Sequence, residues 1–180
     1  MSEGRRRRGT VGGRPALGEV VSVPVRRSTR LLAEVTGVDL SGAAVTVGVL
    51  APGRWALLLF LASSCDACAP FWQATADPRT LGLLEGDRLV TLTRPWPHED
   101  PAVLERLVRG AGEHARAGSV VMSARAWADY GVLGPPFFVL ADGTLVASEG
   151  VAWSPGQVAA DVRRARSGGM EERSTSLAGP

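Results

Sequence analysis

Two cysteines, Cys65 and Cys68, are the only thiols of this chain, and two residues separate them. A structural disulfide framework normally uses several cysteines that lie far apart in the sequence, so these two are not expected to staple a fold. Two thiols at this spacing can form a local redox pair or provide half of a metal site. In a redox pair, one thiolate attacks a disulfide of the substrate, and the other thiol resolves the mixed disulfide that results.

A metal site is the first alternative for the two thiols. Zinc needs three or four protein ligands, and the sequence holds no second cysteine or histidine pair at a suitable spacing. A copper carrier could add one histidine to the two sulfurs, and the chain has only His98 and His114. His98 lies between Pro97 and Glu99, and His114 lies in a polar segment, so both are expected to face solvent. We therefore expect neither a metal nor an organic cofactor.

The residues around the cysteines predict a strand followed by a helix. The run Trp55–Ala62 is continuously apolar and bounded by turn-forming residues, which is typical of a short strand buried on both faces of a sheet. The two serines after it can cap a helix that begins at or near Cys65. Because a helix N-terminus stabilises an anion, Cys65 is expected to attack as a thiolate and Cys68 to resolve. Asp66 between them would raise the pKa of a neighbouring thiolate.

Strands and helices alternate along the rest of the chain, which predicts an α/β fold. Asp100, Ser123 and Ser154 are expected to cap helices, and a proline follows the first and the last of them. Asp142-Gly143 between two β-prone runs predicts a hairpin. The other expected strands cover residues 20–25, 31–35, 44–49, 88–93, 120–122, 137–140 and 144–151. This order implies a mixed sheet that ends in an antiparallel pair.

Together with the downstream segment, the cysteine motif resembles the thioredoxin superfamily. The resemblance rests on the apolar strand that runs into Cys65-Asp66-Ala67-Cys68, on the β-α-β spacing after it, and on the Asp142-Gly143 hairpin. It rests also on the segment Tyr130–Leu140, which looks like the family's approach to its cis-proline strand. It covers residues 31–166. The extra strands before Trp55 and the long middle insert look most like the TlpA-type (redoxin) thiol–disulfide reductases.

The resemblance implies a thioredoxin-like three-layer sandwich, in which helices flank a mixed central sheet, with a β extension at the N-terminus. It implies a thiol–disulfide oxidoreductase whose Cys65–Cys68 dithiol exchanges with protein or low-molecular-weight thiol and disulfide substrates. Cys65 would be the nucleophile and Cys68 the resolving thiol. Pro136 would be the cis-proline, and Pro135 and Pro136 would bind an extended substrate as an added strand.

The chain departs from the family pattern at several positions. Ser64 stands where a tryptophan usually precedes the first cysteine, and Leu59 stands where thioredoxins often bury a carboxylate that helps to deprotonate the resolving thiol. Pro70 cannot donate to a carbonyl four residues back, so a kink in the helix is expected. Ala62 stands where peroxiredoxins use a threonine or serine, so that resemblance fails. These departures leave a redox-silent thioredoxin-like binding module as the alternative function.

Two tryptophans could lie either in the core or on a docking surface beside the sulfurs. Trp72 lies on the helix expected after the cysteines, and Trp96 lies in a proline-rich loop over residues 94–98. A large aromatic side chain near an exchanged sulfur can form part of a docking surface. Most other aromatic residues of the chain lie in or beside apolar elements and are assigned to the core.

Composition limits the remaining classes of protein. The chain has 180 residues, of which 45% are hydrophobic and 21% charged, and this globular mix excludes a wholly disordered protein. The net charge of +2 gives no reason to expect a nucleic-acid partner. No apolar run approaches the ~20 residues that a membrane-spanning helix needs.

The ends of the chain predict its domain boundaries and its compartment. The basic run Arg5–Arg8 is followed by polar, glycine-rich residues rather than by an apolar stretch, so we expect no export signal and a cytoplasmic protein. We expect a disordered basic leader over residues 1–18, one monomeric thioredoxin-like domain over 19–166, and a disordered tail over 167–180.

Overall fold

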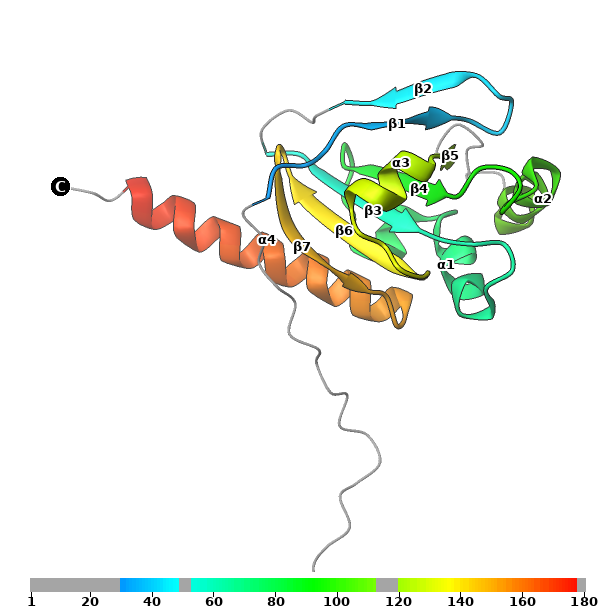
Figure 1. Ribbon diagram of the computed structural model, residues 1–180. Helices are drawn as coiled ribbons and strands as arrows, with labels where there is room; N and C mark the ends of the chain where they lie inside the picture. Colours follow the sequence, from blue (N-terminus) through cyan, green and yellow to red (C-terminus); the bar gives the residue numbers. More distant parts are fainter. Residues whose placement is uncertain (1–29, 49–52, 113–119, 178–180) are drawn as a thin grey trace, which may run out of the picture.

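One mixed sheet of seven strands forms the centre of the molecule (Figure 1). The structure is a computed structural model, and it describes residues 30–48, 53–112 and 120–177. The strand order is β2-β1-β5-β4-β3-β6-β7, in which β4 pairs in parallel with β3 and β5, and the other neighbours are antiparallel. The strands are β1 (Val35–Val38), β2 (Ala44–Val47), β3 (Trp55–Phe60), β4 (Arg88–Thr93), β5 (Val120–Met122), β6 (Phe137–Asp142) and β7 (Leu145–Val151). The predicted α/β class and mixed sheet are confirmed.

The helices in the described ranges begin largely where the sequence places their caps. They are the α-helices α1 (Ala69–Ala74), α2 (Pro101–Ala111), α3 (Ala124–Asp129) and α4 (Pro155–Leu177), with the 3-10 turns η1 (Asp66–Cys68) and η2 (Pro78–Leu81). The Asp100 carboxylate accepts from the Ala102 N–H at 2.8 Å, and the Ser123 hydroxyl accepts from the Ala126 N–H at 3.0 Å. Both predicted caps are confirmed. None of these helices is long and apolar enough to cross a membrane.

The central strand β3 lies between two hydrophobic layers. All six of its residues are buried, as its continuous apolar run predicts. Leu57 and Leu59 pack on one face with residues of α1, α2 and α4, whereas Leu58 and Phe60 pack on the other face with α3. Figure 1 shows the sheet with helices on both sides. The segment that leaves β3 therefore emerges at the middle of a three-layer sandwich.

The N-terminal β extension is present, but its first strand begins later than predicted. The strand expected over residues 31–35 begins at Val35, and Leu31 forms only an isolated bridge with Leu145. The reason is that this segment first runs beside the start of β7, where the Leu32 N–H donates to a backbone carbonyl at 2.7 Å. The chain then pairs as β1 with β2 and β5.

The C-terminal helix runs further than predicted. α4 continues to Leu177, whereas the sequence placed the end of the domain at residue 166 and a tail over 167–180. The glycine pair at 168–169 indicated a helix end, but the helix formers Met-Glu-Glu-Arg follow it at 170–173. The predicted leader over 1–18 and the predicted strand over 20–25 lie outside the described residues.

Candidate active site

The two cysteines follow the C-terminal end of β3. The Leu61 N–H still donates to the Leu92 carbonyl of β4 at 3.0 Å, and the chain leaves the sheet after this bond. Cys65 is half-buried and Cys68 is fully buried, and both are free thiols. The pair therefore has one sulfur on the side that solvent reaches and one that the core encloses.

The segment that holds the cysteines is a 3-10 turn rather than the start of an α-helix. Cys65 has an extended backbone (φ −101°, ψ 109°) and precedes η1, which ends at Cys68. Pro70 has no N–H with which to reach the Asp66 carbonyl, so this carbonyl accepts instead from the Ala69 N–H, three residues along. The expected helix start at or near Cys65 is confirmed, because η1 begins at Asp66 and continues into α1, but the first turn is 3-10 and α1 itself has only six residues. The macrodipole at Cys65 is therefore only that of a 3-10 turn and a short α-helix.

Cys68 lies in the core beneath this turn, in contact with the hydrophobic cluster on the α1 side of the sheet. Burial, which is the largest effect, and a hydrogen bond with Cys65 raise the pKa of Cys68 to about 12. A backbone hydrogen bond from Ala62 lowers this pKa, while the charges of Cys65 and Glu99 raise it further. Cys68 is therefore a protonated thiol at neutral pH.

A buried carboxylate that the sequence analysis missed lies beside the motif. Glu99 is 4% exposed, and its two carboxylate oxygens accept from the Ser63 N–H at 3.1 and 3.2 Å. Ser63 lies between the end of β3 and Cys65, so Glu99 holds the segment that leads into the motif. The same carboxylate acts electrostatically on Cys68. The site thus has a buried acidic group, although Leu59 occupies the position where the sequence analysis looked for one.

The loop before β6 brings Pro135 and Pro136 to the C-terminal end of β3, because Phe60 at this end pairs with Phe137 at the start of β6. The Cys65 thiol faces the Pro135 carbonyl as a donor, with a long Sγ···O distance of 3.9 Å. The Pro135–Pro136 peptide bond is cis, and the Pro136 carbonyl accepts from the Ala152 N–H at 3.0 Å. A second cis bond, between Trp96 and Pro97, lies in the loop after β4. The cysteine motif and the loop before β6, which are far apart in the sequence, therefore meet at Cys65.

The remaining residues singled out in the sequence take different places. Asp66 is exposed on η1. Trp72 is buried in the core, and its indole N–H donates to a backbone carbonyl at the exit of β3 at 3.3 Å, whereas Trp96 is 73% exposed. His98 is exposed after β4, and His114 lies outside the described residues. Within the described ranges, no three His, Cys, Asp or Glu side chains lie close enough together to hold a metal ion.

Comparison with known proteins rests on structure rather than on sequence. No protein-family model matches the chain, and no curated protein matches its sequence. A thiol:disulfide interchange protein of the thioredoxin family from Chlorobium tepidum is 17% identical, with a TM-score of 0.56 over 79% of this chain and 99% of that chain. StoA from Bacillus subtilis is 16% identical, with a TM-score of 0.52 over 71% of this chain and 95% of that chain. This chain has a thioredoxin-like fold.

A thioredoxin-like protein from Aeropyrum pernix is similar to the same extent, with 15% identity and a TM-score of 0.56 over 73% of this chain and 89% of that chain. The fold that the sequence resemblance implied is therefore confirmed. In this thioredoxin-like chain, Cys65, Cys68 and the Pro135–Pro136 loop lie at the end of the central strand, with Glu99 behind them. This arrangement offers one accessible thiol, one enclosed thiol and the Pro135 carbonyl beside them.

Proposed function

We propose that this protein is a thiol–disulfide oxidoreductase, in which Cys65 is the nucleophile and Cys68 is the resolving thiol. The observation that carries the proposal is the difference in burial between the two thiols. Cys65 is half-buried beyond the C-terminal end of β3, whereas Cys68 is fully buried with a pKa of about 12. A substrate disulfide can therefore approach Cys65 first, and Cys68 can react only with a sulfur that is already bound to Cys65.

The reaction in the reductive direction has two steps. The Cys65 thiolate attacks one sulfur of the substrate disulfide, the S–S bond breaks, and its electron pair leaves with the other sulfur, which takes a proton from water. Cys68 then gives up its proton and attacks the Cys65 sulfur, and the second substrate thiol leaves. In sum, two electrons and two protons pass from the protein dithiol to the substrate disulfide.

The neighbouring groups support the second step. In the mixed disulfide Cys65 carries no charge, so one of the effects that raise the pKa of Cys68 is removed. Glu99 is assigned as a positioning residue, because its carboxylate holds the Ser63 N–H and thereby the approach of the chain to Cys65. Asp66, exposed on the turn between the thiols, stays a predicted modulator of their charge.

The substrates that we propose are disulfides and thiols of proteins or of small molecules. Pro135 has no N–H, so an extended substrate could pair only with its carbonyl, which lies 3.9 Å from the Cys65 sulfur. Exposed apolar side chains stand near Pro135, among them Leu133 before β6 and Trp153 after β7. They offer a protein substrate apolar contact area. A cytoplasmic site of action and a monomeric state stay predictions from the sequence.

Reduction of insulin by dithiothreitol tests the proposal. The wild-type protein is expected to accelerate the precipitation of the insulin B chain, and Cys65→Ser is expected to abolish this acceleration. Ser64→Ala is the matched control, because Ser64 is an exposed neighbour of Cys65. A folded wild-type protein that gives no acceleration would contradict the proposal and favour a redox-silent binding module.

A further inference from the structure

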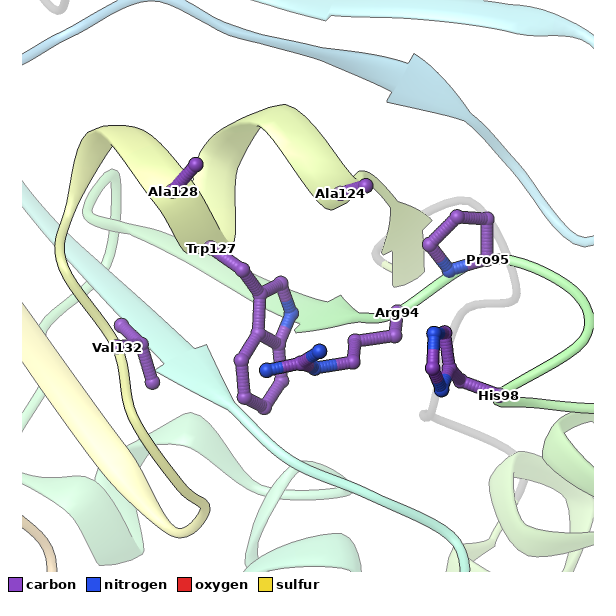
Figure 2. A pocket seen from close by; sticks show the side chains of 7 residues that line it. All are labelled: Arg94, Pro95, His98, Ala124, Trp127, Ala128 and Val132. Atoms are coloured by element: carbon purple, nitrogen blue, oxygen red, sulfur yellow. The ribbon is translucent and has the colours of Figure 1, made fainter.

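A pocket of about 200 Å³ opens between the loop after β4, the helix α3 and the loop before β6 (Figure 2). The residues that line it include Arg94, Pro95, His98, Ala124, Trp127 and Val132. Two of these side chains are basic, and none of the lining residues that the structure describes is acidic. The pocket therefore combines apolar walls with a positive end.

Arg94 is held in place without an ion pair to any described residue. Its guanidinium carbon lies 4.7 Å from the centroid of the Trp127 ring, which is the geometry of a cation–π contact. Figure 2 shows the Arg94 side chain lying along the Trp127 ring, with His98 beside it. A guanidinium oriented by stacking still presents its N–H donors to an anion.

Trp127 brings a third donor to this pocket. Its side chain is 4% exposed, and its indole nitrogen has no hydrogen-bond partner in the described part of the chain. The ring cannot easily turn away, because it packs edge-to-face against Phe60 with the ring centroids 5.6 Å apart. In Figure 2 the indole nitrogen lies on the side of the ring toward Arg94 and His98. A buried donor without an acceptor in a pocket indicates a place for an acceptor atom of a ligand.

The pocket adjoins the dithiol through two short stretches of chain. His98 is next to Glu99, whose carboxylate holds Ser63 in front of the cysteine motif. Val132 precedes Pro135 by three residues, a stretch that spans at most about 11 Å when fully extended. The Pro135 carbonyl in turn lies 3.9 Å from the Cys65 sulfur. The pocket and the Cys65 sulfur therefore lie at the C-terminal ends of the neighbouring strands β3 and β4, and a substrate joined to Cys65 can extend toward the pocket.

We propose that this pocket is a carboxylate-binding subsite, which favours disulfide substrates that carry a carboxylate close to the reacting sulfur. The inference rests on the proposed exchange reaction at Cys65 and adds a substrate class to it. The planar fork of Arg94 matches a carboxylate, and the Trp127 N–H and the His98 ring supply further donors. The volume admits one acidic side chain or the acid end of a small disulfide.

Rates of exchange with two small disulfides of similar size test the subsite. The reduced protein is mixed with dithiodipropionate, which carries two carboxylates, or with bis(2-hydroxyethyl) disulfide, which is uncharged. We expect Arg94→Gln to lower the preference for the diacid about tenfold, the loss of one charge-assisted hydrogen bond. The matched control is Arg88→Gln, which removes the same charge from the opposite end of β4 and should keep the preference. Equal preferences in the two variants would overturn the subsite.

Two further experiments distinguish carboxylates of proteins from those of small acids and test the subsite without disulfide exchange. Peptide disulfides with glutamate or glutamine beside the cystine show whether the effect of Arg94 extends to acidic protein segments or is confined to small acids. Binding without exchange is followed by the NMR signal of the Trp127 indole N–H during titration with glutarate and, as control, glutaramide. A shift with glutarate in wild type but not in Arg94→Gln supports the subsite even if no disulfide reacts with Cys65. No shift with glutarate overturns it.

Discussion

Among single residues, the burial of Cys68 and the half-exposure of Cys65 separate two chemically identical thiols into different roles. Burial raises the pKa of Cys68 to about 12, so this sulfur stays protonated until Cys65 has reacted. Glu99 contributes in two ways, because its carboxylate both holds the Ser63 N–H and adds a negative charge near Cys68. These two contributions can be separated by substitution.

We predict that Glu99→Gln lowers the pKa of Cys68, since it removes a negative charge that disfavours the thiolate. The pKa should stay above its ordinary value, because burial is the larger cause and is unchanged. Ultraviolet titration of the Cys68 thiolate in a Cys65→Ser background measures this. Glu99→Ala should in addition lose about 1–3 kcal/mol of unfolding free energy, because the Ser63 N–H loses its acceptor. Glu105→Gln, at a half-buried position on the helix that follows, is the control, and an equal pKa in both variants would refute the role of Glu99.

The residues of the site could be predicted only in part. Cys65 and Cys68 stand in a short motif whose spacing indicates a redox pair, whereas Pro135 and Pro136 were expected only from the resemblance to the thioredoxin superfamily. Glu99 has no such signal, because an acidic residue just before a helix is common for reasons of helix stability alone. Glu99 lies close to Ser63 because β3 and β4 are parallel neighbours, so that their C-terminal ends lie side by side. The pocket lined by Arg94 and Trp127 likewise joins segments that are far apart in the sequence, so no local motif predicts it.

The elements were predicted best where local chemistry alone decides their boundaries. β3 follows from a continuous apolar run, and α2 and α3 follow from their side-chain caps. The helical segment begins next to Cys65 as predicted, but the missing N–H of Pro70 gives its first turn 3-10 geometry, which the serine caps do not indicate. β1 was misplaced because its position depends on contacts with β7 and β5, which no local pattern encodes.

The pairing of β1 with β5 depends on one glycine. A Cβ at Gly37 would lie 2.4 Å from the Met122 carbonyl oxygen and 2.8 Å from a methyl group of Val121. We predict that Gly37→Ala lowers the free energy of unfolding by about 1–3 kcal/mol, because backbone and packed side chains must shift. Urea denaturation measures the loss. Gly48→Ala is the control, because a Cβ there meets nothing within 4 Å, and an equal effect at both sites would contradict this close approach.

Across the whole molecule, the two ends of β3 and β4 have different roles. The C-terminal ends carry the thiols, Glu99 and the pocket. At the other end, Asp87 accepts hydrogen bonds from the Trp55 and Leu84 N–H groups and pairs with Arg166 of α4. The Arg166 guanidinium also lies 5.2 Å from the centroid of the Trp55 ring. These contacts hold α4 against the N-terminal ends of β3 and β4.

We predict that Arg166→Ala destabilises the fold without altering the chemistry of the folded site. Asp87 would keep a buried charge without its cation, so the free energy of unfolding should fall by about 2–4 kcal/mol in urea denaturation. The rate at which Cys65 reacts with a disulfide should stay that of wild type under folding conditions. Arg163→Ala, an exposed position on the same helix, is the control. A loss of reactivity in fully folded Arg166→Ala would contradict the division between the two ends.

The assigned order of attack is tested most directly by the products that single-cysteine variants form with a disulfide peptide. Intact-mass spectrometry is applied to the wild type, to Cys68→Ser and to Cys65→Ser after the same challenge. We predict that the wild type loses two hydrogens as it forms its internal disulfide, and that Cys68→Ser accumulates a peptide adduct on Cys65. Cys65→Ser should stay unmodified because Cys68 is enclosed. Equal adducts on both variants, or a wild type that keeps both thiols, would contradict it.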